Sequence, residues 1–496
     1  MSAVLTIDQG TTGSRALVVA QDGRILASAY SEFTQHYPQP GLVEHDANEI
    51  WQVTRRVIGE ALAAAGKSAD VRGIGISNQR ETVVVWDRQT GEPVHHAIVW
   101  QDRRTADMCA RLRAEGREAD VRRRTGLVLD PYFSATKIAW LLEHVPGLRK
   151  RAEAGELAAG TIDAWLVHRL SGGAVHATDP TNASRTLLFD IDERAWDDAL
   201  LDLFGVPRSM LPEVMPSSGE FAVASGDAIG VDVPITGIAG DQQAALFGQG
   251  CVTPGLAKQT FGTGAFLLLN TGDERVESRH GLLTTVACGP RGDAVYALEG
   301  SVFIAGAAVQ WLRDELGIIE SAPETDALAR SLASNDGVYM VPAFVGLGAP
   351  HWNAEARGAI LGLTRGTGRA HFARAALEAM AYGTCEVLSA MEADSGIDAT
   401  ELRVDGGAAM NDWMMHFLAG IVDLPVRRPA LVETTALGAA GLAGLASGVW
   451  RDVDHFLESR EKPAVFESTM KAEERRSLMD GWHRAVAAVQ AFARTS

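Results

Sequence analysis

Apolar and polar positions alternate in short runs over the first thirty residues of the chain. The apolar runs at 4–7, 16–20 and 25–29 are separated by turn residues at 8–14 and 21–24. Short apolar runs bounded by Gly, Asp and Ser are typical of strands joined by tight turns. The pattern predicts a three-stranded antiparallel meander.

A different periodicity follows. Residues 47–65 carry apolar positions at helical spacing, and residues 71–76 are typical of a short buried strand. Strand and helix patterns then continue to about residue 250. This succession predicts a mixed α/β fold.

The opening plan recurs in the second half of the chain. Residues 256–260 lead into the turn Phe261-Gly262-Thr263-Gly264 and a second apolar run at 265–269. A long helix is predicted at 369–395, and residues 402–408 predict a strand that ends in a glycine turn. Because 496 residues exceed what one hydrophobic core usually organises, we expect two related domains, 1–250 and 251–496.

Composition and charge narrow the possible functions. Apolar residues make up 46% of the chain and charged residues 22%, which is typical of a globular protein. The formal net charge of −18, without a long basic stripe, makes nucleic acid an unexpected partner. Four scattered cysteines predict neither a zinc site nor a disulfide framework.

Two observations bear on membranes and targeting. The apolar segment 436–450 is too short to cross a bilayer, and its Ala, Gly and Leu content is typical of a tightly packed buried helix. The first residues lack a basic region followed by an apolar one. We therefore expect a cytoplasmic protein without membrane insertion.

The turn after the first predicted strand combines residues that suit phosphate. Asp8-Gln9-Gly10-Thr11-Thr12-Gly13-Ser14-Arg15 offers backbone N–H groups at its glycines, hydroxyl donors, and a carboxylate that can hold Mg²⁺ through water. An ordinary hairpin turn uses the same residue types, so this segment alone leaves both interpretations open. The glycine turns at 261–264 and 404–408 favour a nucleotide site. No P-loop sequence is present and no dinucleotide fingerprint convincingly follows a strand, so the nucleotide fold must be of another kind.

These three turns resemble the two phosphate turns and the adenosine turn of the actin-like ATPase superfamily. Within it the chain is similar to the FGGY carbohydrate kinases, and most similar to the glycerol kinases among them, through an ordered series of motifs at 75–82, 100–104, 130–134, 240–244, 346–352 and 362–366. The resemblance implies two actin-like, ribonuclease H-like domains with a nucleotide cleft between them. It further implies transfer of the γ-phosphoryl group of ATP, with Mg²⁺, to glycerol, by a homodimer or homotetramer.

The resemblance also implies roles on the acceptor side. It makes Asp241 the general base beside the acceptor hydroxyl, a task that a carboxylate within hydrogen-bond reach can perform. The implied ligands of the hydroxyls and of the carbon edge of glycerol are Arg80, Glu81, Tyr132, Asp241 and Gln242, with Trp100 and Phe266. Without the resemblance, Asp241 is a helix N-cap, Trp100 and Phe266 are core residues, and Arg80-Glu81 is a surface ion pair.

On the nucleotide side the implied residues come from both halves of the chain: Thr11, Thr12, Gly13, Arg15, Thr263, Gly306, Gln310, Gly407 and Asn411. Asp8 is implied as the residue that orients Mg²⁺. Without the resemblance, Gly306 simply marks close helix packing.

Some positions depart from the family pattern. Position 13 is Gly where many glycerol kinases carry Ser, which removes a side-chain donor but leaves the backbone N–H. Residues 225–234 lack the basic glycine-rich loop through which some members bind fructose 1,6-bisphosphate, and 217–234 contain no histidine for phosphorylation. We expect neither form of regulation.

Two other functions remain open. A pentulose kinase or another sugar kinase of the same family would use the same ATP chemistry on a different acceptor, although Arg80-Glu81 and Tyr132 disfavour it. An actin-like nucleotide switch would hydrolyse ATP slowly and would need no polyol pocket.

Overall fold

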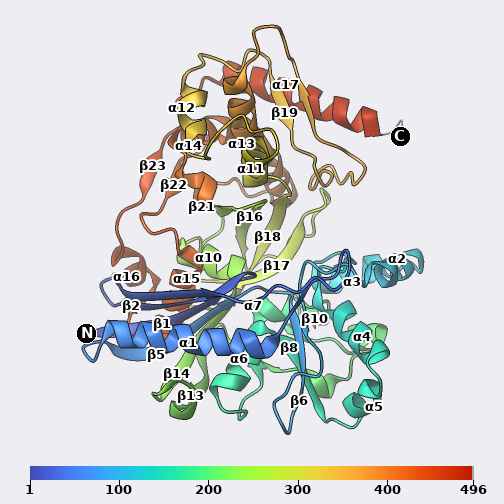
Figure 1. Cartoon of the computed structure of the whole chain (residues 1–496), viewed down its shortest axis with the longest axis vertical. Coiled ribbons are helices and arrows are strands. Elements are labelled where there is room, and N and C mark those ends of the chain that lie inside the picture. The colour runs from blue at the N-terminus through green and yellow to red at the C-terminus, as the bar shows by residue number, and fades with distance from the viewer. Residues whose placement is uncertain (494–496) are drawn as a thin grey trace.

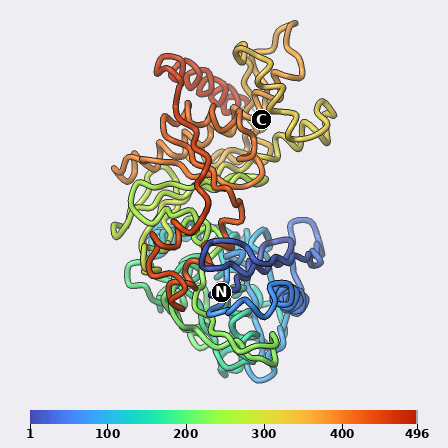
Figure 2. The backbone as a smooth tube through the Cα atoms, turned by 90° about the vertical axis from the view of Figure 1, so that its left-hand side faces the viewer, coloured from blue at the N-terminus to red at the C-terminus, as the bar shows by residue number. Residues whose placement is uncertain are grey.

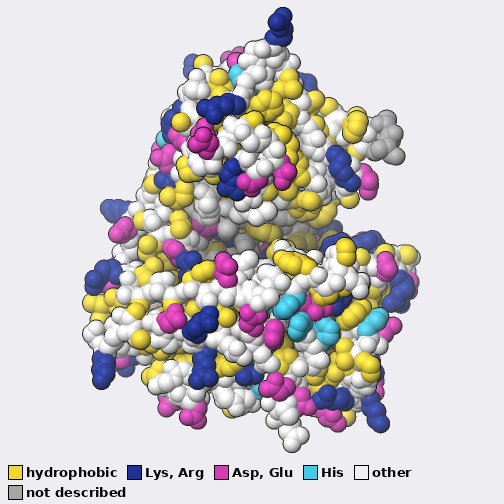
Figure 3. All heavy atoms as spheres, viewed as in Figure 1, with side chains coloured by type: hydrophobic (Ala, Val, Ile, Leu, Met, Phe, Trp, Pro, Cys, Tyr) yellow, Lys and Arg dark blue, Asp and Glu magenta, His cyan; other side chains and the backbone are white. Residues whose placement is uncertain are grey.

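The computed structural model describes residues 1–493. Its chain forms two lobes, each built on one mixed sheet, and the sheets lie one above the other (Figure 1). A hollow separates the lobes on one side of the molecule (Figure 3). Among residues 1–493, no helix combines the length and apolarity that a membrane crossing requires.

The lower sheet confirms the predicted meander. β1, β2 and β3 pair antiparallel, and β5 and β14 run parallel to β1 on its other side. The sheet order is β13-β14-β5-β1-β2-β3. The strands are β1 (Ser2–Gln9), β2 (Gly13–Ala20), β3 (Ile25–Glu32), β5 (Asp70–Asn78), β13 (Ser218–Ala224) and β14 (Val233–Gly240).

The upper sheet repeats this plan, as the sequence predicts. Its meander is β15, β16 and β18, and the parallel strands β21 and β22 follow beside β15. The sheet order is β17-β18-β16-β15-β21-β22-β23. The strands are β15 (Leu256–Phe261), β16 (Ala265–Gly272), β17 (Leu283–Cys288), β18 (Ala294–Val302), β21 (Glu401–Gly406), β22 (Val426–Arg428) and β23 (Ala464–Phe466).

Smaller sheets extend both lobes. β4 (Glu44–His45), β7 (Ala97–Ile98), β6 (Val83–Asp87) and β8 (Leu157–Thr161) form a four-stranded sheet in this order. Three strand pairs complete the β structure: β9 (Ala177–Thr178) with β12 (Glu213–Val214), β10 (Phe189–Asp190) with β11 (Ala195–Trp196), and β19 (Tyr339–Val341) with β20 (Ala359–Leu361).

The predicted helices at 47–65 and 369–395 are confirmed as α1 (Ala47–Ala65) and α13 (Arg369–Ser395). Asp46 caps α1, since its carboxylate accepts hydrogen bonds from the backbone N–H groups of Asn48 and Glu49. The other helices of the lower lobe are α2 (Ala106–Ala114), α3 (Glu118–Thr125), α4 (Ser134–His144), α5 (Leu148–Glu153), α6 (Ile162–Leu170), α7 (Pro180–Ala183), α8 (Asp198–Phe204), α9 (Gly226–Ile229) and α10 (Asp241–Gly248). Those of the upper lobe are α11 (Gly306–Asp314), α12 (Glu324–Arg330), α14 (Asp412–Val422) and α17 (Ala472–Ala493).

The predicted buried helix is confirmed for residues 436–446, which belong to α15 (Thr434–Ala446), whereas residues 447–450 follow the end of that helix and precede α16 (Val453–Glu458). α15 packs against β1, β5 and β14 of the lower sheet, although it comes late in the chain. Gly438 permits close contact with α10, because a β-carbon there would lie 1.8 Å from the carbonyl oxygen of Ala244. The lower lobe therefore includes chain from both ends of the sequence (Figure 2).

Candidate active site

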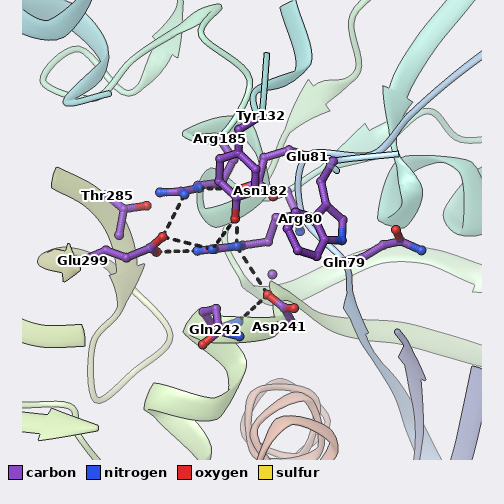
Figure 4. A network of polar contacts seen from close by, with 12 residues as sticks. Gln79, Arg80, Glu81, Tyr132, Asn182, Arg185, Asp241, Gln242, Thr285 and Glu299 are labelled. Atoms are coloured by element: carbon purple, nitrogen blue, oxygen red, sulfur yellow. Dashed lines mark hydrogen bonds and ion pairs between the residues drawn. The ribbon is translucent and has the colours of Figure 1, made fainter. Parts of the chain in front are cut away.

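The candidate acceptor residues converge at one edge of the lower sheet. Arg80 and Glu81 follow the end of β5, and Asp241 follows the end of the parallel strand β14. Parallel strands bring the residues after their carboxyl ends to the same edge, where open α/β sheets bind ligands. Tyr132 and Gln242 join them there (Figure 4). We call Arg80, Glu81, Tyr132, Asp241 and Gln242 the acceptor cluster.

Arg80 lies at the centre of the acceptor cluster, with only 2% of its side chain exposed. Its Nε is 3.3 Å from Asp241 Oδ1 and 3.5 Å from Glu81 Oε1, and its Nη2 donates to the Tyr132 hydroxyl at 3.2 Å. The carboxylate of Glu299 binds both terminal nitrogens of Arg80, at 2.6 and 3.1 Å. Burial excludes the alternative of a surface ion pair for Arg80-Glu81.

Asp241 has one carboxylate oxygen fixed and one without a protein partner. Its Oδ1 accepts from the backbone N–H of Gln242 at 2.7 Å and faces Arg80, whereas no residue in 1–493 donates to its Oδ2. Burial raises the pKa of this carboxyl, and Arg80 opposes that effect. Asp241 is the first residue of α10, so the N-cap interpretation is wrong: Gly240 holds that position.

Two aromatic residues stand beside the acceptor cluster. The Trp100 and Tyr132 rings meet edge to face, with centroids 5.6 Å apart, and both are partly exposed. Trp100 Nε1 also donates to the Thr11 hydroxyl at 2.9 Å. Trp100 is therefore no core residue, and it connects the acceptor cluster to the first predicted phosphate turn.

Gln242 connects the acceptor cluster to the upper sheet. Lys258 on β15, a fully buried residue, donates from its Nζ to Gln242 Oε1 at 2.6 Å and to the Thr260 hydroxyl at 2.7 Å. Thr260 pairs in register with Phe266 on β16, and Phe266 is partly buried. Phe266, which the sequence predicts as an acceptor residue, therefore lies on β16, directly opposite the Thr260 that Lys258 binds.

The candidate nucleotide residues of the upper lobe line one cavity of about 550 Å³. The sequence predicted five of its lining residues, Thr263, Gly306, Gln310, Gly407 and Asn411. Gly406 makes the turn beside them possible, because its φ is +86° and a β-carbon there would lie 2.2 Å from the Phe261 carbonyl oxygen. Gly306 packs against the turn at Gly262, so it combines close packing with a place in the cavity wall.

The first predicted phosphate turn joins β1 to β2. Gly10 N–H donates to the Gly13 carbonyl at 2.9 Å, and Thr11 and Thr12 lie between them. Arg15 on β2 pairs with Glu433 at 2.9 Å. At Gly13 a β-carbon would lie 2.7 Å from both the Ser31 carbonyl oxygen and the Tyr30 hydroxyl. Tyr30 and the neighbouring strand therefore leave no room for the Ser that many glycerol kinases carry at this position.

Asp8 forms no ion pair with any other residue in 1–493, although Arg15 and the Ser77 hydroxyl favour its charged form. Burial, and then repulsion by Asp241, raise the pKa of its carboxyl to about 7. Among residues 1–493, no set of three His, Cys, Asp or Glu side chains is placed to hold a metal. Mg²⁺ keeps several waters and commonly needs one or two carboxylates beside substrate phosphates, so a single carboxylate that forms no ion pair within residues 1–493 fits it.

Sequence reasoning missed three charged residues of this region, Arg185, Lys258 and Glu299. All are buried within or directly behind the acceptor cluster. Lys258 and Glu299 each stand alone in an otherwise apolar or uncharged strand. A charged residue inside a buried strand is costly without a partner, and this signal could have identified both.

Comparison with known proteins identifies the family to which the chain is similar. Residues 3–248 match the N-terminal domain of the FGGY family of carbohydrate kinases, and residues 257–447 match its C-terminal domain. The chain is 57% identical over 485 residues to a glycerol kinase from Deinococcus radiodurans, with 98% of this chain and 97% of the relative covered. It is 56% identical over 491 residues to one from Thermus thermophilus, with 99% of each covered.

A solved structure agrees over the whole fold. The crystal structure of Plasmodium falciparum glycerol kinase with ADP superimposes with a TM-score of 0.94 at 36% identity, covering 99% of this chain and 98% of that one. The two matched domains span most of the chain, and the relative from Thermus thermophilus covers 99% of it. The chain belongs to the FGGY family of carbohydrate kinases.

Proposed function

We propose that this protein is an ATP-dependent glycerol kinase, which forms glycerol 3-phosphate and ADP. The observation that carries the proposal is the state of Asp241. One of its oxygens is fixed by Arg80 and the backbone, and the other is left without a donor among residues 1–493. A carboxylate so oriented can accept the proton of an acceptor hydroxyl.

The acceptor cluster supplies the contacts that a small triol needs. Tyr132 and Gln242 offer hydroxyl and amide groups, and Glu81 has its Oε2 free of any donor within residues 1–493. Trp100 and Phe266 provide apolar surface for the carbon edge of the triol. Polar groups on one side and rings on the other favour glycerol over a longer, fully hydroxylated sugar.

The nucleotide binds in the upper cavity with its phosphates toward the β1–β2 turn. Gly407 and Asn411 bind the adenosine side, and Thr263, with the turn at Thr11, Thr12 and Gly13, binds the phosphates. Gly306, Gln310 and Arg15 are further proposed contacts. Asp8 would hold Mg²⁺ through water, and the ion would supply positive charge that offsets the charge of the nucleotide phosphates.

Transfer follows from these positions. As the terminal hydroxyl oxygen of glycerol bonds to the γ-phosphorus, its proton passes to Asp241, and the bond from the γ-phosphorus to the bridging oxygen of ADP breaks. Arg80 remains beside Asp241 throughout and favours its ionised form. Positioning and charge stabilisation are the main demands of phosphoryl transfer.

A panel of acceptors tests the proposed function. With MgATP, the purified protein is expected to release ADP rapidly with glycerol and far more slowly with xylulose, ribulose, gluconate or erythritol. Efficient use of a pentulose and failure with glycerol would establish a different sugar kinase. Negligible ADP release with every acceptor, together with ATP-dependent assembly, would establish a nucleotide switch.

Asp8→Asn provides a separate test of the Asp8 carboxyl, whose pKa burial raises. The native pKa of about 7 exceeds the ordinary value of 3.8, so the folded state holds this proton more tightly than the unfolded state does. Stability is therefore lost as pH rises from about 4 through 7. Because Asp8 is partly exposed, we expect the variant to gain roughly 1–3 kcal/mol at pH 8 and far less at pH 4.

Urea unfolding of wild type and variant in EDTA at both pH values measures this difference. If the variant is less stable than wild type at pH 8, the raised pKa of Asp8 is wrong. In the presence of nucleotide, the variant is expected to need more Mg²⁺ for half-maximal turnover.

The family resemblance further supports a cytoplasmic homodimer or homotetramer. Sedimentation velocity at micromolar protein concentration would determine the number of subunits.

A further inference from the structure

Four charged side chains form a closed buried group, which contains two members of the acceptor cluster and two residues that bind them. Arg80, Glu81, Arg185 and Glu299 expose 2%, 2%, 0% and 3% of their side chains. We call these residues the buried quartet (Figure 4). Its two guanidinium groups and two carboxylates balance one another in charge.

Arg185 and Glu299 hold the other two members of the buried quartet. Arg185 Nε donates to Glu81 Oε1 at 2.8 Å, and its Nη2 donates to Glu299 Oε1 at 2.9 Å. Glu299 in turn binds both terminal nitrogens of Arg80. Although burial opposes ionisation, Arg185 and Arg80 lower the pKa of Glu299 to about 2 and so favour the charged carboxylate.

Aromatic packing fixes Arg185 itself. Its guanidinium carbon lies 5.9 Å from the centroid of the Tyr132 ring and 5.3 Å from that of the Phe133 ring. Tyr132 is also a member of the acceptor cluster and receives a hydrogen bond from Arg80. Arg185 therefore contacts two members of the acceptor cluster: it donates a hydrogen bond to Glu81, and its guanidinium packs on the Tyr132 ring.

The two lobes both contribute to the buried quartet. Arg80, Glu81 and Arg185 belong to the lower lobe, at the ends of β5 and α7, whereas Glu299 lies on β18 of the upper sheet. Gln243 reinforces this junction, since its Nε2 donates to the Thr285 hydroxyl on β17 at 3.0 Å. The upper lobe therefore contributes residues to the acceptor cluster's surroundings, through Glu299, as well as to the cavity proposed for the nucleotide.

We propose that Arg185 and Glu299 are positioning residues of the acceptor site, which orient Glu81 and Arg80 for a polyol without touching it. This inference rests on the proposed phosphorylation of glycerol. The contact of Arg185 with Oε1 of Glu81 leaves Oε2 available to accept from an acceptor hydroxyl. The bidentate grip of Glu299 sets the plane of the Arg80 guanidinium, and hence the place of Tyr132 and Asp241 around it.

Glu299→Gln and Arg185→Lys test the inference. Glu299→Gln keeps the size of the side chain but loses the charge that binds both terminal nitrogens of Arg80. Arg185→Lys keeps the charge but loses the planar guanidinium that donates to Glu81 and Glu299 together. We expect KM for glycerol to rise about ten- to a hundredfold, as the loss of an ionic hydrogen bond predicts. KM for ATP and the affinity for a non-hydrolysable ATP analogue are expected to stay within about twofold of wild type. Steady-state kinetics with each substrate varied in turn separate the effect on glycerol from the effect on ATP, and calorimetric titration measures the affinity for glycerol directly.

Glu378→Gln is the matched control. Glu378 pairs with Arg374 at 2.7 Å on α13 in the upper lobe, and its side chain is 1% exposed, so it represents a buried ion pair outside the acceptor side. Its variant is expected to melt at a lower temperature but to keep the wild-type KM for glycerol. If Glu299→Gln and Arg185→Lys change glycerol KM no more than this control does, the positioning role is refuted.

The possible outcomes distinguish the positioning role of Arg185 and Glu299 from the proposed phosphorylation of glycerol. A wild-type protein that does not phosphorylate glycerol refutes the proposed function. A wild type that uses glycerol, with variants that resemble the control, refutes only the positioning role. If Glu299→Gln fails to fold, Arg185→Lys, which retains the positive charge, decides the question, and an unchanged glycerol KM in that variant counts against the proposal.

Discussion

Asp241→Asn is expected to lower kcat by a factor on the order of 10²–10⁴, the usual effect of removing a general base. The amide keeps the shape of the side chain, and its oxygen can still accept from the Gln242 backbone and face Arg80. The nitrogen would occupy the place of Oδ2, where it donates a proton rather than accepting one. Initial rates under saturating MgATP and glycerol measure the loss.

Nucleotide affinity serves as the control for Asp241→Asn. Because the cavity lined by Gly407 and Asn411 does not include Asp241, binding of an ATP analogue is expected to remain near that of wild type. A variant that retained more than half of the wild-type kcat would exclude Asp241 as the base.

Arg80→Ala is expected to lower kcat/KM for glycerol by about a hundredfold or more, because its loss removes several charge-assisted hydrogen bonds at once. The substitution would leave Glu299 buried with Arg185 as its remaining partner. Breaking a buried ion pair typically costs about 3–5 kcal/mol, so the free energy of unfolding should fall as well. KM for ATP is expected to change little.

Kinetics combined with urea unfolding separate the two effects of Arg80→Ala. Arg80→Lys is the informative companion, since it keeps the charge but cannot bind Glu299 in a bidentate manner. Unchanged use of glycerol together with a greatly raised KM for ATP would place Arg80 in the nucleotide site and contradict the acceptor assignment.

The regular elements of this fold were largely predictable from local patterns. The meander at residues 2–32 and the helices at 47–65 and 369–395 have strong periodicity, and the structure confirms them. The burial of α15 was also predictable, because a helix of Ala, Gly and Leu has no polar face to expose to water.

Long-range placement was not predictable in this way. No local pattern indicates that α15 lies on the lower sheet or that Glu299 binds Arg80, which is 219 positions away in sequence. Predicted site residues came from motifs whose members are close in sequence, whereas Arg185 and Glu299 act through pairings with residues between 104 and 219 positions away. The N-cap interpretation of Asp241 failed by one residue, a typical error at helix ends.

The path of the chain between the lobes limits how the protein can be divided. The chain enters the upper lobe after α10, returns with α15 and α16 to the lower lobe, and crosses again to β23 and α17 (Figure 2). Val4, Leu17, Leu437 and Trp450 share one core. A fragment that stopped at residue 250 would expose the face of β1, β5 and β14 that α15 covers. Such a fragment should aggregate when expressed alone, and supplying residues 251–496 as a separate polypeptide should restore its solubility.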